Sequence, residues 1–144
     1  MPFGLAMGMP QLSRKSVAIP PQLSNEKIID GTFDDGAAWT AGLGWIIEDG
    51  AATRSAVAST SGLSQAYAFR AGALHVVTYS ISNLTAPMFV VQFTGGSTRT
   101  GTSRTVDGTY TETLLANAGN NSFRIFAGSN AAATIDNVSL KEIL

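Results

Sequence analysis

The sequence has no cysteine and only one histidine among its 144 residues. These two absences exclude disulfides, thiol nucleophiles and metal sites built from several histidines. No apolar run approaches the ~18 residues that a membrane-spanning helix needs. Charged residues make up 13% of the chain and the formal net charge is −1. We therefore expect no membrane partner and no nucleic-acid partner, since a net charge near zero does not attract an anionic membrane surface or a nucleic acid.

What the sequence does contain is 44% hydrophobic residues and 15 glycines, divided into short segments of strand character. No segment keeps a helical period over 11 residues, whereas Asp49-Gly50 and Asp107-Gly108 are strong signals for tight turns between paired strands. The expected strands are 45–48, 51–56, 63–69, 74–83, 88–94, 102–106, 109–116, 122–127 and 133–143. Many short strands with such turns predict an all-β, two-sheet antiparallel sandwich.

Within these strands, His75 alternates with Val77, Tyr79 and Ile81, so it falls on the face that should point into the core. A core position does not suit a catalytic base. The acidic pairs at 34–35 and 48–49 are adjacent in the chain, so their side chains diverge on an extended backbone. The sequence therefore predicts that the protein is not an enzyme.

The first 25 residues differ from the rest and contain four of the five prolines. Their apolar residues alternate with small ones, which is typical of an extended segment lying on an apolar surface. We expect residues 1–25 to form an extended N-terminal arm and residues 26–144 to form the sandwich. The arm either folds back on its own domain or binds a neighbouring subunit, in which case the partner-binding residues are Phe3, Leu5, Met7, Met9 and Leu12. Arg14-Lys15 follows the apolar segment instead of preceding it, so the start does not look like a secretion signal.

Two segments bracket the body of the chain: 28–36, followed by Trp39, and 133–143, in which the alternation changes phase at Asp136-Asn137. A change of phase indicates a β-bulge. The pair of segments resembles the first and last strands of carbohydrate-binding-module-like jelly rolls, especially those of tailed-phage virion proteins. The resemblance implies a jelly-roll topology in which the two segments lie side by side, with Phe33 and Val138 as inward-facing neighbours.

The same resemblance implies two candidate sites. A structural calcium ion would be held by Asp34 or Asp35 together with Asp136, although Thr32 and Asn137 stand where acidic residues are common. Alternatively, the Asp136 side chain hydrogen-bonds to the backbone at the bulge. The expectation is that the protein has no cofactor other than this candidate calcium ion. The candidate glycan contacts are Trp39, Trp45, Arg99 and Arg104.

Three functions fit the sequence. The main hypothesis is a phage virion structural protein, made in the host cytoplasm, that acts as a capsid decoration (cement) subunit. Its partners would be the major capsid protein or other virion subunits and further copies of itself, with a trimer favoured. The second is a glycan-binding adhesion module of a tail or head fibre, whose partner is a host surface glycan. The third is a carbohydrate-binding accessory domain of a secreted glycoside hydrolase.

Overall fold

The computed structural model describes residues 19–144, which form two antiparallel sheets of five strands each. The first, sheet A, has the strand order β1-β4-β9-β6-β7. Its strands are β1 (Thr40–Ala41), β4 (Ser61–Ala66), β6 (Phe89–Thr94), β7 (Arg99–Thr100) and β9 (Ser122–Ala127). Every strand pairing in this sheet is antiparallel, and residues directly opposite one another point to the same side, so that their side chains form rows across the sheet.

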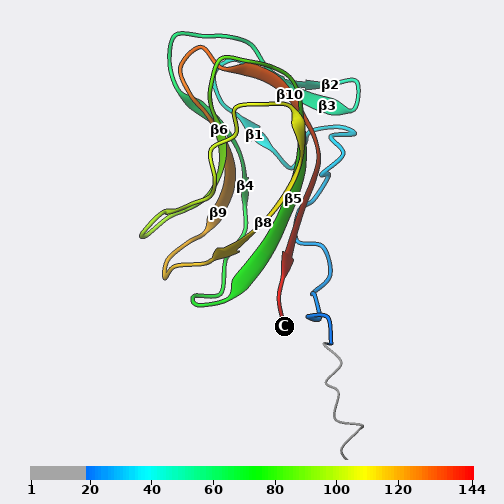
Figure 1. The fold of residues 1–144 in the computed structure, drawn as a ribbon, viewed down its shortest axis with the longest axis vertical. Coiled ribbons are helices and arrows are strands. Elements are labelled where there is room, and N and C mark those ends of the chain that lie inside the picture. The colour runs from blue at the N-terminus through cyan, green and yellow to red at the C-terminus, as the bar shows by residue number, and fades with distance from the viewer. Residues whose placement is uncertain (1–18) are drawn as a thin grey trace, which may run out of the picture.

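The second, sheet B, has the order β2-β3-β10-β5-β8 and packs face to face against sheet A (Figure 1). Its strands are β2 (Trp45–Glu48), β3 (Ala51–Arg54), β5 (Leu74–Thr85), β8 (Gly108–Leu115) and β10 (Ala132–Glu142). The last strand lies in the middle of this sheet, between β3 and β5. The all-β jelly-roll sandwich predicted from the sequence is confirmed.

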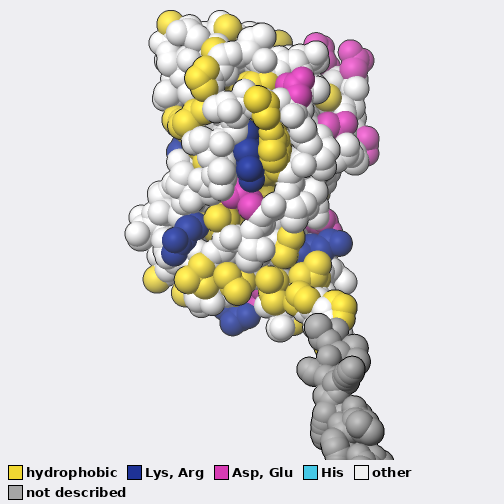
Figure 2. All heavy atoms as spheres, in the orientation of Figure 1, with side chains coloured by type: hydrophobic (Ala, Val, Ile, Leu, Met, Phe, Trp, Pro, Cys, Tyr) yellow, Lys and Arg dark blue, Asp and Glu magenta, His cyan; other side chains and the backbone are white. Residues whose placement is uncertain are grey.

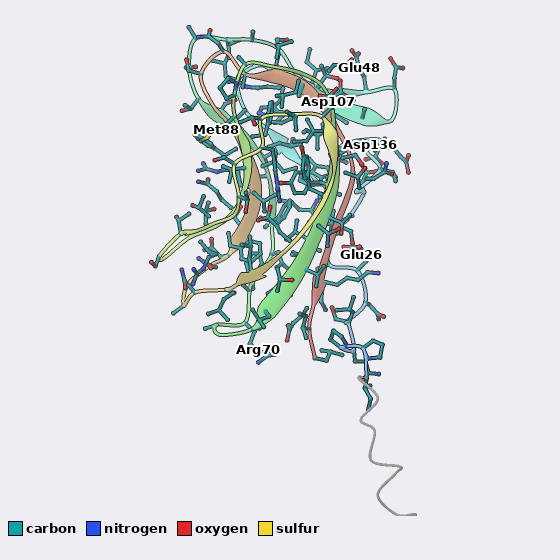
Figure 3. All side chains as sticks on the ribbon, viewed as in Figure 1. Glu26, Glu48, Arg70, Met88, Asp107 and Asp136 are labelled. Carbon is teal, nitrogen blue, oxygen red and sulfur yellow. The ribbon has the colours of Figure 1, made fainter. Side chains whose placement is uncertain are left out.

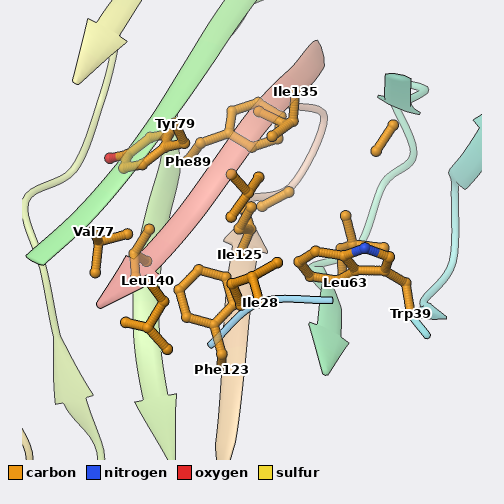
Figure 4. Close-up of a cluster of buried hydrophobic side chains, with 14 of the residues drawn as sticks. Ile28, Trp39, Leu63, Val77, Tyr79, Phe89, Phe123, Ile125, Ile135 and Leu140 are labelled. Atoms are coloured by element: carbon orange, nitrogen blue, oxygen red, sulfur yellow. The ribbon is translucent and has the colours of Figure 1, made fainter. Parts of the chain in front are cut away.

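The core fills the space between the sheets with every second residue of the long strands (Figure 4). On β5, His75, Val77, Tyr79 and Ile81 are all buried, as their spacing predicted. On β9, Phe123 and the two residues at 125 and 127 are fully buried, while those between them are not. The alternation therefore fixes which side of each strand faces solvent.

The two bracketing segments meet as expected, but the front one is not a strand. Residues 28–36 form consecutive turns, because the carboxylate of Asp30 accepts hydrogen bonds from the backbone amides of residues 34, 35 and 36. The backbone amide of Val138 donates to the carbonyl of Gly31 at 2.9 Å. Phe33 and Val138 are 1% and 4% exposed and belong to one core cluster. The proximity is confirmed; the strand assignment for 28–36 is corrected.

The predicted change of phase in the last strand is also confirmed. On β10, Asp136 pairs with Ser80, but the next registered pair is Ser139 with Thr78. Between these two pairs, β10 therefore has one residue more than β5, which is a β-bulge. Asn137, within the bulge, has a positive φ of 52°. The side-chain Oδ1 of Asp136 accepts a hydrogen bond from the amide of Asn137 at 2.7 Å.

The two turn signals have different outcomes. Asp49-Gly50 joins β2 to β3 as predicted, with positive φ at both residues. The hairpin of 102–106 with 109–116 is wrong. The segment before Asp107 lies along β6, where Arg104 bridges to Phe89, whereas β8 pairs with β5 in the other sheet. The carboxylate of Asp107 accepts hydrogen bonds from the amides of residues 83 and 84, which anchors this crossing to the end of β5.

The segment leading into the sandwich runs beside the end of β10. Three backbone amides donate hydrogen bonds to backbone carbonyls, each at 2.8 Å: that of Ser24 to Glu142, that of Lys27 to Leu140 and that of Leu144 to Gln22. The predicted partner-binding residues of the arm, Phe3 to Leu12, lie outside the described residues. Within residues 19–144, no helix is long and apolar enough to cross a membrane.

Candidate functional site

The outer face of sheet A presents one polar row that crosses all five of its strands. Cross-strand partners place Thr40 opposite Ser64, Ser64 opposite Arg124, Arg124 opposite Gln92 and Gln92 opposite Thr100. These side chains point away from the core, because the residues that flank them on β4, β6 and β9 are buried. We call these five residues the polar row.

Arg124 and Gln92 form the centre of the polar row. The Arg124 Nε donates to Gln92 Oε1 at 3.0 Å, and Nη2 donates to the same oxygen. Gln92 Nε2 in turn lies 3.4 Å from Thr100 Oγ1. A Cβ added to Gly62 would lie 2.5 Å from Arg124 Cδ, so the missing side chain of Gly62 leaves the space that the arginine occupies. The Arg124 side chain therefore passes over Gly62, and its guanidinium is held by Gln92.

An apolar surface adjoins the polar row. Phe126 stands two residues beyond Arg124 on β9, opposite Gly62 and Val90, and the Arg124 guanidinium carbon lies 5.1 Å from its ring centroid. Among the aromatic side chains of residues 19–144, Phe126 alone is neither in the core cluster nor packed against it. It is the aromatic ring on which the apolar C–H face of a sugar could pack next to hydrogen-bonding groups.

The outer face of sheet B offers different chemistry. Thr78 and Thr111 are joined through their hydroxyls at 3.1 Å, and Ser80 and Thr109 at 3.0 Å. These hydroxyls already bond to one another, and the strands in this part of the face carry no aromatic side chain that points outward. The outer face of sheet A therefore has more groups that could orient a ligand than the outer face of sheet B.

The structure places the two predicted arginines in bonds within the protein. Arg104 Nε donates to the Tyr79 hydroxyl at 3.0 Å, its Nη2 donates to Glu112 Oε2 at 3.2 Å, and its guanidinium lies 4.2 Å from the Tyr110 ring centroid. Burial is the main cause that raises the pKa of Tyr79 to about 12, so its hydroxyl stays protonated as a donor to Glu112. This cluster spans the two sheets and holds the 101–106 segment against them.

Arg99 has a similar structural role at the edge of sheet A. Its Nε donates to the carbonyl of Leu115 at 2.8 Å and its Nη2 to Asn117 Oδ1 at 3.1 Å. Both acceptors belong to the end of β8 or the loop after it, so Arg99 ties β7 to the other sheet.

The two tryptophans predicted as glycan contacts are buried. Trp39 is 7% exposed and packs against Phe33 and Phe123, and Trp45 is 5% exposed with its ring edge against Phe89. A sugar cannot stack on a ring whose faces are covered, so this expectation is corrected. Burying such large rings between the sheets stabilises the folded state more than leaving them exposed would.

The residues predicted for calcium do not form a metal cluster. Asp34 accepts a hydrogen bond from Thr32, and Asp136 accepts one from backbone, as described above. Across residues 19–144 no group of three or more histidine, cysteine or acidic side chains is arranged to hold a metal.

His75 lies in the core among Tyr67, Phe69 and Phe93. Its Nδ1 is 3.2 Å from the carbonyl of Ala73, and burial lowers its pKa despite the Glu142 carboxylate 4.0 Å from Nε2. The sole histidine is thus a neutral packing residue.

Sequence reasoning missed Arg124, Gln92 and Phe126. Strand alternation within 122–127 puts Phe123 and Ile125 on one side and therefore leaves Arg124 and Phe126 on the other. What the sequence did not supply was the order of strands that brings Gln92 and Thr100 into the same row as Arg124.

Solved structures with this fold include several carbohydrate-binding modules. A structure described as "CBM4 structure and function" matches with a TM-score of 0.56 and 16% identity, over 80% of this chain and 99% of that one. The N-terminal cellulose-binding domain of Cellulomonas fimi β-1,4-glucanase C matches with a TM-score of 0.56 and 20% identity, over 78% and 94%. The CBM22-1 xylan-binding domain of Paenibacillus barcinonensis Xyn10C also matches, with a TM-score of 0.55 and 12% identity, over 88% and 98%.

A phage protein shares the fold as well. The enzymatically active domain of bacteriophage CBA120 tailspike protein 4 matches with a TM-score of 0.57 and 14% identity, over 82% of this chain but only 21% of that one. This chain therefore corresponds to about a fifth of that tailspike structure. No family model matches the sequence, and no curated protein matches it either.

These matches establish a carbohydrate-binding-module-like fold. They give no support to the capsid-decoration hypothesis. Three of the four structures named above are carbohydrate-binding modules, and the fourth is described as an enzymatically active domain.

Proposed function

We propose that this protein is a non-catalytic glycan-binding module that holds a sugar chain against the outer face of sheet A. The observation that carries the proposal is the polar row beside Phe126: hydrogen-bonding groups from five strands lie in one line next to a partly exposed aromatic ring that lies outside the core cluster. A sugar chain needs this combination, because its hydroxyls take directional hydrogen bonds while its C–H faces pack on apolar surface. The fold shared with cellulose-binding and xylan-binding domains supports the same function.

The binding mode follows from the geometry of the row. Successive strands of a sheet are ~4.8 Å apart, so groups on alternate strands are spaced by about the length of a two-sugar repeat. An extended glycan lying across the strands would meet Ser64, Arg124, Gln92 and Thr100 in turn. Gln92 and Arg124 are already bonded to each other, which reduces the side-chain freedom lost on binding.

The narrower context we propose is an adhesion module of a phage tail or head fibre that recognises a glycan on the host surface. The shared fold of a tailspike domain favours it. In this context the module is located on the virion, and other virion subunits and copies of this chain are its protein partners.

Calorimetry with β-1,4-glucan and xylan oligosaccharides, together with a glycan array, tests the binding face. We expect Gln92→Ala and Phe126→Ala each to weaken binding of whichever glycan is recognised by at least about tenfold, the loss of one or two good contacts. Thr111→Ala, on the outer face of sheet B, is the matched control and should bind as the parent does. Loss of binding in the control with no loss in the two variants would place the site on sheet B instead.

A further inference from the structure

Acidic residues are distributed unequally between the two sheets. The five strands of sheet A contain none, whereas those of sheet B contain Glu48, Glu112, Asp136 and Glu142. The remaining acidic residues fall in the 26–35 segment, which lies beside β10, and in the turns at 49 and 107. In Figure 2, the acidic side chains of the visible face lie over its centre and right flank, and none lies on the left flank over β6 and β9. Figure 3 shows Glu26, Glu48 and Asp136 on that same right side.

Arg124 is the charged side chain of the polar row, and no acidic residue balances it. The ion pairs within residues 19–144 join Arg70 to Glu142 and Arg104 to Glu112, and the neutral His75 lies beside Glu142. Arg124 instead bonds to the neutral amide of Gln92. Arg99 is likewise without an acid, but it does not belong to the polar row: it pairs with the buried Phe93, and its Nε and Nη2 donate to acceptors at the end of β8 and in the loop after it.

The orientation of Arg124 leaves one end of its guanidinium available. A guanidinium has five N–H donors in a planar fork, and two of its edges fit the two oxygens of a carboxylate. Nε and Nη2 on one edge bond to Gln92 Oε1, while Nη1 makes no hydrogen bond within the described residues. The edge formed by Nη1 and the second N–H of Nη2 is therefore free to receive an anion.

From these observations we infer that the glycan bound by sheet A is acidic, and that its carboxylate binds the free edge of Arg124. This inference rests on the proposed function and names its class of ligand. A sugar carboxylate at Arg124 places the sugar ring over the Phe126 side of the row and its hydroxyls toward Gln92 and Ser64. The absence of acidic side chains from the strands of sheet A removes the repulsion that such a ligand would otherwise meet.

A matched pair of sugars separates the inference from the proposed function. Cellohexaose and the hexamer of β-1,4-linked glucuronic acid share one backbone and differ at C6, which is CH2OH in the first and a carboxylate in the second. A second pair is glucuronoxylan and the same polymer after reduction of its carboxyl groups. Calorimetry at low salt should show at least one acidic member bound about tenfold or more tightly than its neutral partner. Added salt should weaken that binding, as expected for a charge-assisted contact.

Arg124→Gln should abolish the difference between the acidic and neutral members, and Arg124→Lys should retain part of it. Lys141→Gln removes one positive charge from the outer face of sheet B and should keep the full preference. Circular dichroism and melting curves confirm that each variant is folded. Equal binding of acidic and neutral members by the parent, or a preference that survives in Arg124→Gln, would overturn the inference and leave the proposed function standing. If the parent binds none of the four probes and no glycan on the array, the proposed function is wrong and the inference is wrong with it.

Discussion

Gly31 and Val138 lie so close that their contact admits no side chain at position 31. The Val138 amide donates to the Gly31 carbonyl, and a Cβ on Gly31 would lie 2.0 Å from the Val138 carbonyl oxygen. Because that oxygen belongs to the backbone of the bulge in β10, it cannot move aside as a flexible side chain would. The contact joins the turn segment at the front of the domain to its last strand.

Gly31→Ala should therefore lower the free energy of unfolding by about 1–3 kcal/mol, the usual cost of overpacking. Urea denaturation measures the effect. Asn25→Ala, at an exposed position earlier in the same segment, serves as the control and should change stability by less than about 0.5 kcal/mol. A Gly31→Ala variant as stable as the control would contradict the close packing of the two segments.

Arg54 provides a second test of the packing. Its side chain is 1% exposed and donates to the carbonyls of Ser59 at 2.6 Å, Gly128 at 3.1 Å and Ala131 at 2.6 Å. Arg54→Ala would leave these acceptors without a donor, at about 1–3 kcal/mol for each that stays buried and unpaired. We expect a loss of about 3 kcal/mol or more in urea unfolding.

The lysine variant distinguishes charge from geometry at the same site. Arg54→Lys keeps the charge, but an ammonium lacks the planar fork that reaches separate acceptors. It should recover only part of the lost stability. Full recovery would show that the charge alone, and not the fork of donors, stabilises the β3–β4 and β9–β10 connections.

The acid response should reveal the buried state of His75. Burial holds its pKa below the ordinary value of 6.5 in the folded protein, so the unfolded chain binds a proton more readily. The free energy of unfolding should thus decrease as the pH falls below about 6.5, and the decrease should end only once the pH has passed the lower pKa of the folded state. His75→Gln should remove this slope between pH 7 and 5, whatever its effect on stability at pH 7. Glu142 gives the contrast: Arg70 holds its pKa below 4.5, so the stability that it supplies is lost only at lower pH.

The sequence predicted the sandwich and much of its interior because alternation and turn chemistry are local properties. His75 through Ile81, the Asp49-Gly50 hairpin and the bulge at Asp136 all follow from residues within a few positions of one another. The failed hairpin at Asp107-Gly108 shows the limit of this reasoning. A turn signal states that the chain reverses, but not whether the two arms stay in one sheet, which here depends on contacts with β6 and β5.

The candidate site was harder to predict for the same reason. Aromatic residues suggested Trp39 and Trp45, but their large apolar surfaces are buried in the core. The residues of the polar row are far apart in the sequence and come together only because β4, β9, β6 and β7 lie in register. No spacing along the chain encodes that register.

Gly62 permits a test of the site that leaves every polar side chain of the row in place. An alanine methyl at this position would meet Arg124 Cδ and Cγ at 2.5 and 2.8 Å, so the arginine would have to swing away from its present path across the sheet. Because the side chain lies on the outer face and can move into solvent, Gly62→Ala should change the free energy of unfolding by less than about 1 kcal/mol. Binding of the glycan recognised by sheet A should nevertheless weaken several-fold, since Arg124 would lose its bond to Gln92 and its fixed orientation. Ala66→Ser, in the adjacent row of the same strand, is the matched control and should bind normally. Unchanged affinity in Gly62→Ala, measured by the same calorimetry, would show that the position of Arg124 does not matter for the ligand and would remove the arginine from the proposed site.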